Sequence, residues 1–237
     1  MVSDLVRDEA ANRENEFVDA IVFSQERGVV MKGTFDDAPP RNQCPNAIGK
    51  WYKPLFYKYV EEIAKTSQTR VEYIPIQQYY RRYSRSIFWG LKYLIPFAGN
   101  FIWRCLFGWL IPPKLSLLKL SAALIRPIRR IMDNNFTFQD FMMPGVNLDE
   151  ALHIIHDQIE VYPLWLCPFS LPSTPGIIRQ RTGRNIIYVN IGVYGESMKN
   201  DFDAQQSIKN INEFLRAVGG FVSLSLLYSI VDQADRN

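Results

Sequence analysis

Residues 73–120 read YIPIQQYYRRYSRSIFWGLKYLIPFAGNFIWRCLFGWLIPPKLSLLKL, and this stretch decides how the rest of the chain must fold. It opens on a cluster of arginines and tyrosines and then becomes rich in Phe, Trp and Tyr. Between Phe88 and Trp109 only Lys92 and Arg104 carry a charge. So much apolar aromatic surface must pack into the protein's own core, or be covered by a partner, a large ligand or a membrane.

The composition narrows the class of protein. The 237 residues are 47% hydrophobic and 14% aromatic, which is enough for one large domain or two small ones. The net charge is only +3, from 27 basic and 24 acidic residues, so no nucleic-acid partner is expected. The three cysteines (Cys44, Cys105 and Cys167) lack the spacing of metal ligands and are odd in number. We expect reduced thiols, a cytosol-facing protein and no metal site.

The apolar stretch leaves two interpretations open. No run of about twenty uncharged apolar residues is present, and residues 87–111 are interrupted by Gly, Pro, Asn, Lys and Arg. This segment is therefore expected to form helical pieces joined by turns, either as a buried hairpin or as an interfacial, membrane-contacting element. The polar, acidic N-terminus lacks the pattern of a cleavable signal peptide.

Hydrophobic periodicity predicts the elements outside the aromatic stretch. Asn147 with Glu150 reads as a capping box, and Gly219-Gly220 as a helix end. The order of elements predicts an α+β fold with a mostly antiparallel sheet covered by helices on one face. Helices are expected over 1–15, 51–65, 147–158 and 203–218, a basic amphipathic segment over 116–132, and strands over 17–24, 29–35, 138–143, 161–167, 187–193 and 222–226.

Two groups of side chains could carry chemistry. His153 and His156 have helical i, i+3 spacing, but with no third ligand nearby they are better read as surface residues than as a metal site. Arg81, Arg82 and Arg85 stand among tyrosines. They could clamp a phosphate, rest on anionic lipid headgroups, or form a solvated basic helix face.

The residues now in view resemble the Delta(24)-sterol reductase family, the Diminuto/Dwarf, seladin-like flavoproteins. The similarity runs in order over most of the chain, although Gly90 stands where the family has Glu. The blocks that carry it are ENEFVDAIVFS (14–24), VVMKGTF (29–35), IGKWYKP (48–54), EYIPIQQYYRRYSRSIFW (72–89), IPFAGNFIWRCLFGWLIPPKLSLLKL (95–120), QDFMMP (139–144), ALHIIHDQIEVYPLWLCPFSLPSTPG (151–176), YVNIGVYGE (188–196) and DFDAQQS (201–207).

The resemblance implies an FAD-dependent oxidoreductase of the vanillyl-alcohol-oxidase type, which reduces the side-chain double bond of a sterol with NADPH at the cytosolic face of the endoplasmic reticulum membrane. Residues 1–237 would be a single cap-like substrate domain with an aromatic insertion at 73–120. The FAD-binding domain and membrane anchor of the family would lie outside this chain, which alone is expected to be inactive.

The resemblance also suggests site residues in the aromatic stretch. Those expected to shape the sterol pocket are Tyr80, Trp89, Asn100, Arg104 and Lys114, and those expected to bind the cofactor are Arg81, Arg82 and Arg85. The alternative function is a non-catalytic paralogue that binds a membrane surface or a sterol-like lipid, or that pairs with a full-length reductase.

Overall fold

The computed structural model describes residues 2–66, 69–86, 88–94, 96–110, 136–171, 186–200 and 202–223. The chain divides into two compact units. Unit 1 combines Met1–Thr34 with Asn134–Asn237, and unit 2 is the segment Phe35–Asp133 between them. The basic amphipathic segment over 116–132 and the last residues of the predicted strand over 222–226 lie outside the described residues.

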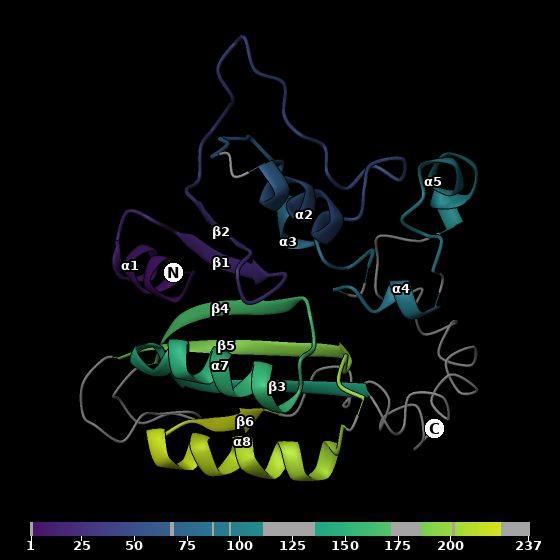
Figure 1. The fold of residues 1–237 in the computed structure, drawn as a ribbon. Coiled ribbons are helices and arrows are strands. Elements are labelled where there is room, and N and C mark those ends of the chain that lie inside the picture. The colour runs from purple at the N-terminus through teal and green to yellow at the C-terminus, as the bar shows by residue number, and fades with distance from the viewer. Residues whose placement is uncertain are drawn as a thin grey trace, which may run out of the picture. The chain divides into compact units, whose positions relative to one another are not determined.

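Unit 1 is built on an antiparallel sheet of six strands, in the order β2-β1-β4-β5-β3-β6 (Figure 1). The strands predicted over 17–24 and 29–35 are confirmed and form an antiparallel hairpin, in which Val18 pairs with Lys32 and Ala20 with Val30. The α+β class and the mostly antiparallel sheet are therefore confirmed. The strands are β1 (Phe17–Val22), β2 (Gly28–Gly33), β3 (Phe136–Pro144), β4 (Leu164–Leu171), β5 (Ile186–Glu196) and β6 (Phe221–Ser223).

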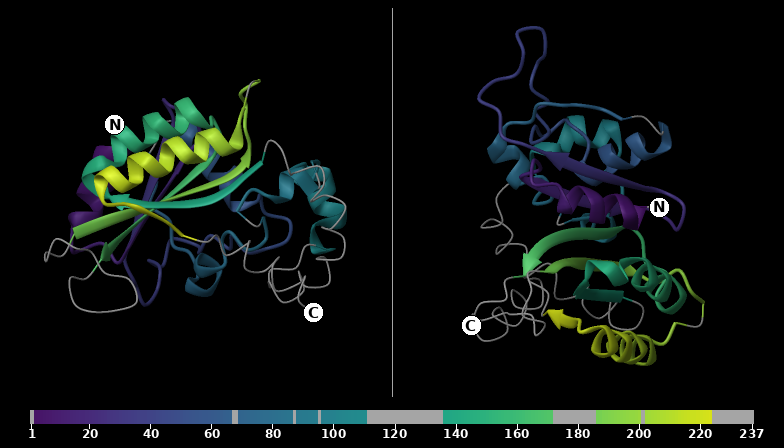
Figure 2. Two further views of the ribbon diagram at one scale, coloured as in Figure 1. Left: turned by 90° about the horizontal axis from the view of Figure 1, so that it is seen from below. Right: turned by 90° about the vertical axis from the view of Figure 1, so that its left-hand side faces the viewer.

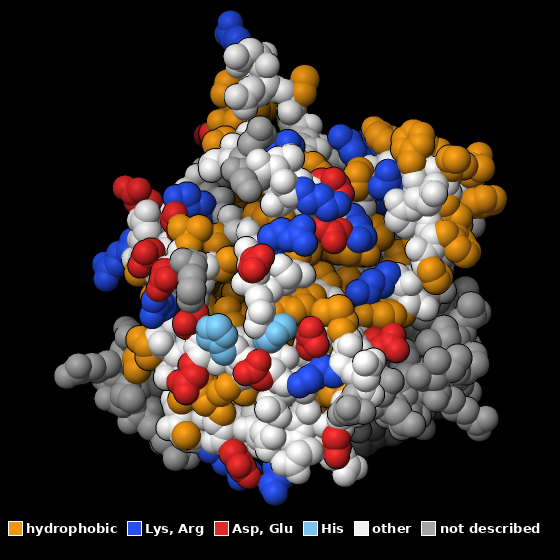
Figure 3. Space-filling model, viewed as in Figure 1, with side chains coloured by type: hydrophobic (Ala, Val, Ile, Leu, Met, Phe, Trp, Pro, Cys, Tyr) orange, Lys and Arg blue, Asp and Glu red, His pale blue; other side chains and the backbone are white. Residues whose placement is uncertain are grey.

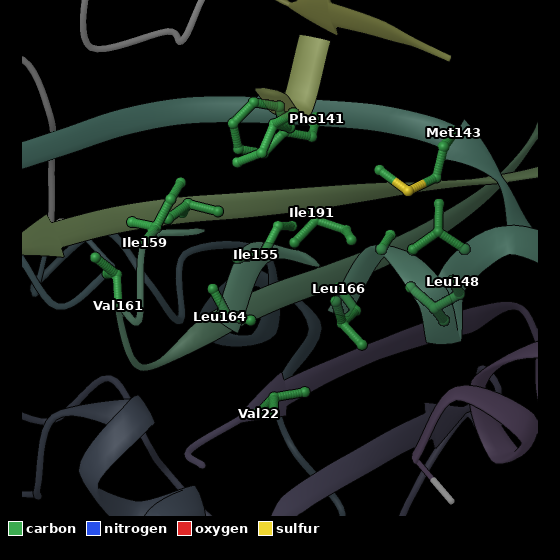
Figure 4. Close-up of a cluster of buried hydrophobic side chains, with 14 of the residues drawn as sticks. Val22, Phe141, Met143, Leu148, Ile155, Ile159, Val161, Leu164, Leu166 and Ile191 are labelled. Carbon is green, nitrogen blue, oxygen red and sulfur yellow. The ribbon is translucent and has the colours of Figure 1, made fainter. Parts of the chain in front are cut away.

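Helices α1 (Val2–Ala11), α7 (Leu148–Gln158) and α8 (Ala204–Val218) cover one face of this sheet (Figure 2). Their apolar stripes meet alternate residues of the strands in a single core, part of which Figure 4 shows. Ile155 of α7 and Leu215 of α8 are each 1% exposed, and Ile191 of β5 is fully buried.

The ends of the two long helices follow different rules. Asp203 caps α8 by accepting hydrogen bonds from the backbone N–H groups of Gln205 and Gln206, and Gly219 ends it with φ of 76°. The predicted capping box at α7 is wrong, because the Asn147 side chain makes no cap hydrogen bond. Asn147 instead closes a short 3₁₀ turn, η3 (Gly145–Asn147), that leads into the helix.

The central strand β5 is buried more completely than its alternating pattern predicts. Val189, Ile191 and Val193 enter the core beneath the helices, as expected for one face. Tyr188 and Tyr194, which point to the opposite face, are each only 5% exposed. The alternation of apolar residues over 187–193 suggests a strand with one buried face, but aromatic residues fill the other face as well, so most of the strand is buried.

Unit 2 is mainly helical in its described residues, with α2 (Phe56–Thr66), α3 (Ile76–Tyr80), α4 (Leu91–Leu94), α5 (Phe101–Phe107) and the 3₁₀ turn η1 (Gly108–Leu110). Helix α2 begins at Phe56 rather than at Trp51, so Pro54 precedes the helix instead of lying in its first turn. None of the described helices has the length and apolar character needed to cross a membrane.

Candidate functional site

The three arginines predicted to bind a cofactor occupy different environments in unit 2. Arg81 is exposed. Arg82 is half-buried, with its guanidinium carbon 3.9 Å from the Tyr79 ring centroid and 4.8 Å from that of Tyr83. One terminal nitrogen of Arg82 donates to the Tyr79 carbonyl oxygen at 2.9 Å. Arg82 is thus stacked within its own segment, and Arg81 is the member of the trio that is open to solvent.

Arg85 is the most buried of the three, at 6% exposure. Its two terminal nitrogens donate to consecutive backbone carbonyls, Nη1 to Lys50 at 2.7 Å and Nη2 to Trp51 at 2.8 Å. This forked arrangement uses the planar geometry of the guanidinium to hold the 50–51 loop. The terminal nitrogens that would clamp a phosphate are therefore already bonded to the protein's own backbone.

The residues predicted to shape a sterol pocket are also dispersed. Trp89 is fully buried, with its ring edge-on to those of Tyr57 and Phe88. Tyr80 is 61% exposed. Asn100 is exposed and caps α5, its side-chain oxygen accepting from the backbone N–H of Ile102 at 2.8 Å. Lys114 lies outside the described residues.

Arg104 and Arg85 are two predicted site residues whose charges interact in the structure. Arg104 is half-buried on α5, and its charge acts on Arg85, lowering the pKa of that guanidinium in addition to the larger effect of burial. Burial likewise lowers the pKa of Arg104. In the described part of unit 2, the Nε atom of each of these arginines is buried without a hydrogen-bond partner. The two guanidiniums therefore lie near enough for their positive charges to repel each other.

A cavity of about 620 Å³ lies elsewhere in unit 2, within the size range of small-molecule pockets. Its apolar wall includes Ile48 and Phe56, and its polar wall includes Asn46, Tyr59 and Glu72. The Tyr59 hydroxyl donates to the Glu72 carboxylate, and burial together with this bond raises the pKa of Tyr59 to about 12. The residues predicted from the sequence are absent from the lining described for this cavity.

Unit 1 carries a polar cluster that the sequence analysis missed. Asp140 on β3, and Asn190 and Tyr194 on β5, alternate with residues of the helix-covered core, so they point to the opposite face of the sheet. The Tyr194 hydroxyl donates to the Asp140 carboxylate, and the Asn190 amide donates to the same oxygen at 3.4 Å. Gly192 makes room for this contact, because a Cβ there would lie 2.7 Å from the Tyr194 hydroxyl.

Burial gives this cluster unusual acid–base properties. Burial raises the pKa of the Asp140 carboxyl, with the two donors working against it. Burial also raises the pKa of the Tyr194 hydroxyl, and the neighbouring carboxylate raises it further. Such a pair can hold and pass a proton in a site that excludes water. The sequence signal was weak, since Asp140 and Tyr194 are 54 residues apart and only strand register brings them together.

The histidines do not add to either site. The Nδ1 atom of His156 lies 3.1 Å from the hydroxyl of Tyr162. His153, on the same helix α7, is exposed. Among the described residues, no group of three His, Cys, Asp or Glu side chains is arranged to hold a metal ion. The three cysteines are free thiols.

Comparison with known proteins gives one consistent result, although no family model and no solved structure matches the chain. The chain is 42% identical over 216 residues to human Delta(24)-sterol reductase, which covers 91% of this chain and 41% of that protein. A Delta(24)-sterol reductase homolog from Caenorhabditis elegans is 37% identical over 223 residues, and the Arabidopsis thaliana Delta(24)-sterol reductase 33% over 226. The chain spans about two fifths of the length of these relatives, at 40–42%. Over that span, the chain belongs to the Delta(24)-sterol reductase family.

Proposed function

We propose that this chain forms part of an FAD-dependent sterol reductase that uses NADPH to reduce the Delta(24) double bond of a sterol side chain. The observation that carries the proposal is the 42% identity to the human enzyme, which extends over 216 residues and so includes both units. Membership of this family also supports the endoplasmic reticulum membrane as the location, with the active site at its cytosolic face.

Reduction of a carbon–carbon double bond adds one hydride and one proton. FAD, when bound, would supply the hydride chemistry. The residues of this chain fit the proton half of the reaction, because a buried carboxyl with a raised pKa lies against a phenol on the sheet face opposite the helices. Among the three arginines, exposed Arg81 is the one able to meet an anionic group of a cofactor, since Arg82 and Arg85 hold the protein's own segments.

The proton would move in two linked transfers within the Asp140–Tyr194 pair. Tyr194 Oη donates its proton to the side-chain carbon of the sterol, and the protonated Asp140 carboxyl returns a proton to Oη. The pair loses one proton in each reduction and leaves a carboxylate that accepts a hydrogen bond from Tyr194, which is the bond seen in the structure. Protonation from water restores the starting state.

A chimera tests this function. Residues of this chain would replace the matching 216-residue region of human Delta(24)-sterol reductase, and conversion of a Delta(24)-sterol would be followed in cells that lack the enzyme. We expect conversion by the chimera and a loss of at least about tenfold with Tyr194→Phe. Tyr188→Phe is the matched control, because Tyr188 lies on the same strand face but donates to the Gly219 carbonyl at 3.1 Å.

Two results would contradict the proposal. A chimera that accumulates and binds FAD but leaves the sterol unreduced would show that this chain does not support the reaction. If Tyr194→Phe and Tyr188→Phe reduced sterol conversion equally, the proposed proton transfer by Tyr194 would be refuted, but the proposed reductase function would not.

A non-catalytic role in binding lipid, or in pairing with a full-length reductase, is the second candidate. The observation that favours it is the exposed aromatic surface of α5, where Phe101 is 68% exposed and Trp109 64%. An inactive chimera, together with co-purification of this chain with a full-length reductase, is the result expected from that role.

A further inference from the structure

Helix α5 exposes its apolar side and turns its charged residue inward, which is the opposite of a helix that packs on a protein core. Phe101, Ile102, Cys105, Leu106 and Trp109 follow one helical stripe, and all five are exposed. The charged residue Arg104 is on the other side, half-buried. A helix that packs on its own protein would bury the apolar stripe and leave the arginine in water.

The exposed apolar surface extends past the helix on both sides. Phe97, before α5, is 59% exposed, and Trp51 and Tyr52 are 42% and 45% exposed. A Cβ on Gly108 would lie 2.7 Å from the Trp51 carbonyl oxygen, which places this loop directly against the end of α5. Figure 3 shows the hydrophobic side chains gathered over α5. We name the surface formed by Phe97, Phe101, Ile102, Leu106, Phe107 and Trp109 the α5 patch.

The size of the α5 patch exceeds what an isolated protein usually leaves in water. Its members are 46–68% exposed. With about 200 Å² for each large side chain, they present roughly 700 Å² of mainly apolar surface. The largest patch on a typical monomer is about 300–600 Å², and patches of that size are often interaction sites.

Charge indicates which kind of partner covers it. Unit 2 contains 16 Lys and Arg but only six Asp and Glu, a net charge of +10, whereas the rest of the chain carries −7. The overall charge of +3 therefore hides a strongly basic unit. Lys50 and Lys53 flank the aromatic pair Trp51 and Tyr52 beside the α5 patch. Trp and Tyr at an apolar surface with lysines around it are the combination that suits the interface of an anionic bilayer.

From this reversed amphipathicity and the charge asymmetry, we propose that the α5 patch docks unit 2 onto an anionic lipid surface, with Phe101 and Trp109 entering the headgroup layer. The Trp109 indole N–H already donates to the Leu106 carbonyl at 2.9 Å, so the ring enters an apolar layer without an unpaired donor. This docking is independent of the sterol reductase activity and of any anchor elsewhere.

Flotation of the purified 237-residue chain with lipid vesicles tests the proposal. One set of vesicles contains phosphatidylcholine alone, and the other about one third phosphatidylserine. We expect binding mainly to the anionic vesicles, weakening as salt screens the charges. The double variant Phe101→Ser, Trp109→Ser should lose at least about tenfold in the partition coefficient, because it replaces two of the most exposed large apolar side chains of the α5 patch with polar ones.

The matched control is Val146→Ser, Met198→Ser, which changes two exposed apolar residues of unit 1, 73% and 59% exposed. It should float like the unaltered chain. Equal flotation of the α5 variant and the unaltered chain would overturn the proposal. A second result would also overturn it. If the unaltered chain sedimented as a dimer, the α5 variant as a monomer, and both bound vesicles equally, the α5 patch would be an interface between two copies of this chain. Failure of vesicle binding would leave the chimera result unaffected, so the two proposals can fail separately.

Discussion

Replacing Arg85 with lysine should destabilise unit 2, and the magnitude follows from two hydrogen bonds. Arg85 donates to the Lys50 and Trp51 carbonyls at 2.7 and 2.8 Å. Lysine keeps the positive charge, so the cost of burying a charge stays nearly constant. Its shorter reach and single nitrogen leave at least one of the two carbonyls unbonded. A hydrogen bond to a charged group contributes about 1.5–3 kcal/mol, so the free energy of unfolding should fall by about 2 kcal/mol.

Equilibrium unfolding in urea, followed by tryptophan fluorescence, measures this change. Four of the five tryptophans lie in unit 2, so the signal reports mainly on that unit. Arg81→Lys is the matched control, because Arg81 is exposed and a surface substitution of this kind should change stability by less than about 0.5 kcal/mol.

Two outcomes would refute the reasoning. If Arg85→Lys and Arg81→Lys changed the midpoint equally, the forked contact would not stabilise unit 2. If Arg85→Lys left unfolding unchanged but weakened binding of FAD or NADPH by the chimera, Arg85 would be a ligand-binding residue, as the sequence first suggested.

Three further predictions concern unit 1. Burial raises the pKa of Asp140 above its ordinary value of 3.8, so its contribution to stability is fully present below that value and is lost as pH rises through the raised pKa. The free energy of unfolding should therefore fall less steeply between acidic and neutral pH in the Asp140→Asn variant. An unchanged slope would contradict the raised pKa of Asp140. Asp203→Ala should cost about 1 kcal/mol in urea unfolding by removing the α8 cap, whereas Asn147→Ala should cost less than about 0.5 because that side chain makes no cap bond. Gly219→Ala should cost about 1 kcal/mol because its φ is 76°, and Gly33→Ala, at an ordinary backbone angle with its nearest neighbour 3.8 Å away, should cost less; equal losses would refute the backbone argument.

Local signals in the sequence predicted unit 1 well. Alternation and helical periodicity identified the strand and helix order, and Asp203 and Gly219 mark the ends of α8 as expected from their intrinsic preferences. The errors occurred where tertiary contacts decide. The start of α2 depends on the path of the 50–55 loop, which Arg85 holds from 34 residues away.

The candidate site was harder to predict for the same reason. The resemblance suggested Trp89 and Asn100 as pocket residues, and their role in a pocket stays a prediction; in the structure Trp89 is fully buried and Asn100 caps α5. The Asp140–Tyr194 pair depends on the register between β3 and β5, which no short stretch of sequence encodes. The sequence left open whether residues 87–111 form a buried hairpin or an interfacial element; in the structure Trp89 and Leu91 are buried, whereas the α5 stripe is exposed.

The discontinuity of unit 1 has a consequence for synthesis on the ribosome. Strand β1 pairs with β4 through Ala20 and Leu166, so the middle of the sheet closes only after residue 166 has been made. At about 5–20 residues per second, the nascent β1–β2 hairpin waits roughly 7–27 s for its partner, while the 133 residues from Thr34 to Leu166, which include all of unit 2, are made. A lone hairpin is barely stable in water. Unit 2 is contiguous, so within these 237 residues it can fold before the sheet of unit 1 is complete.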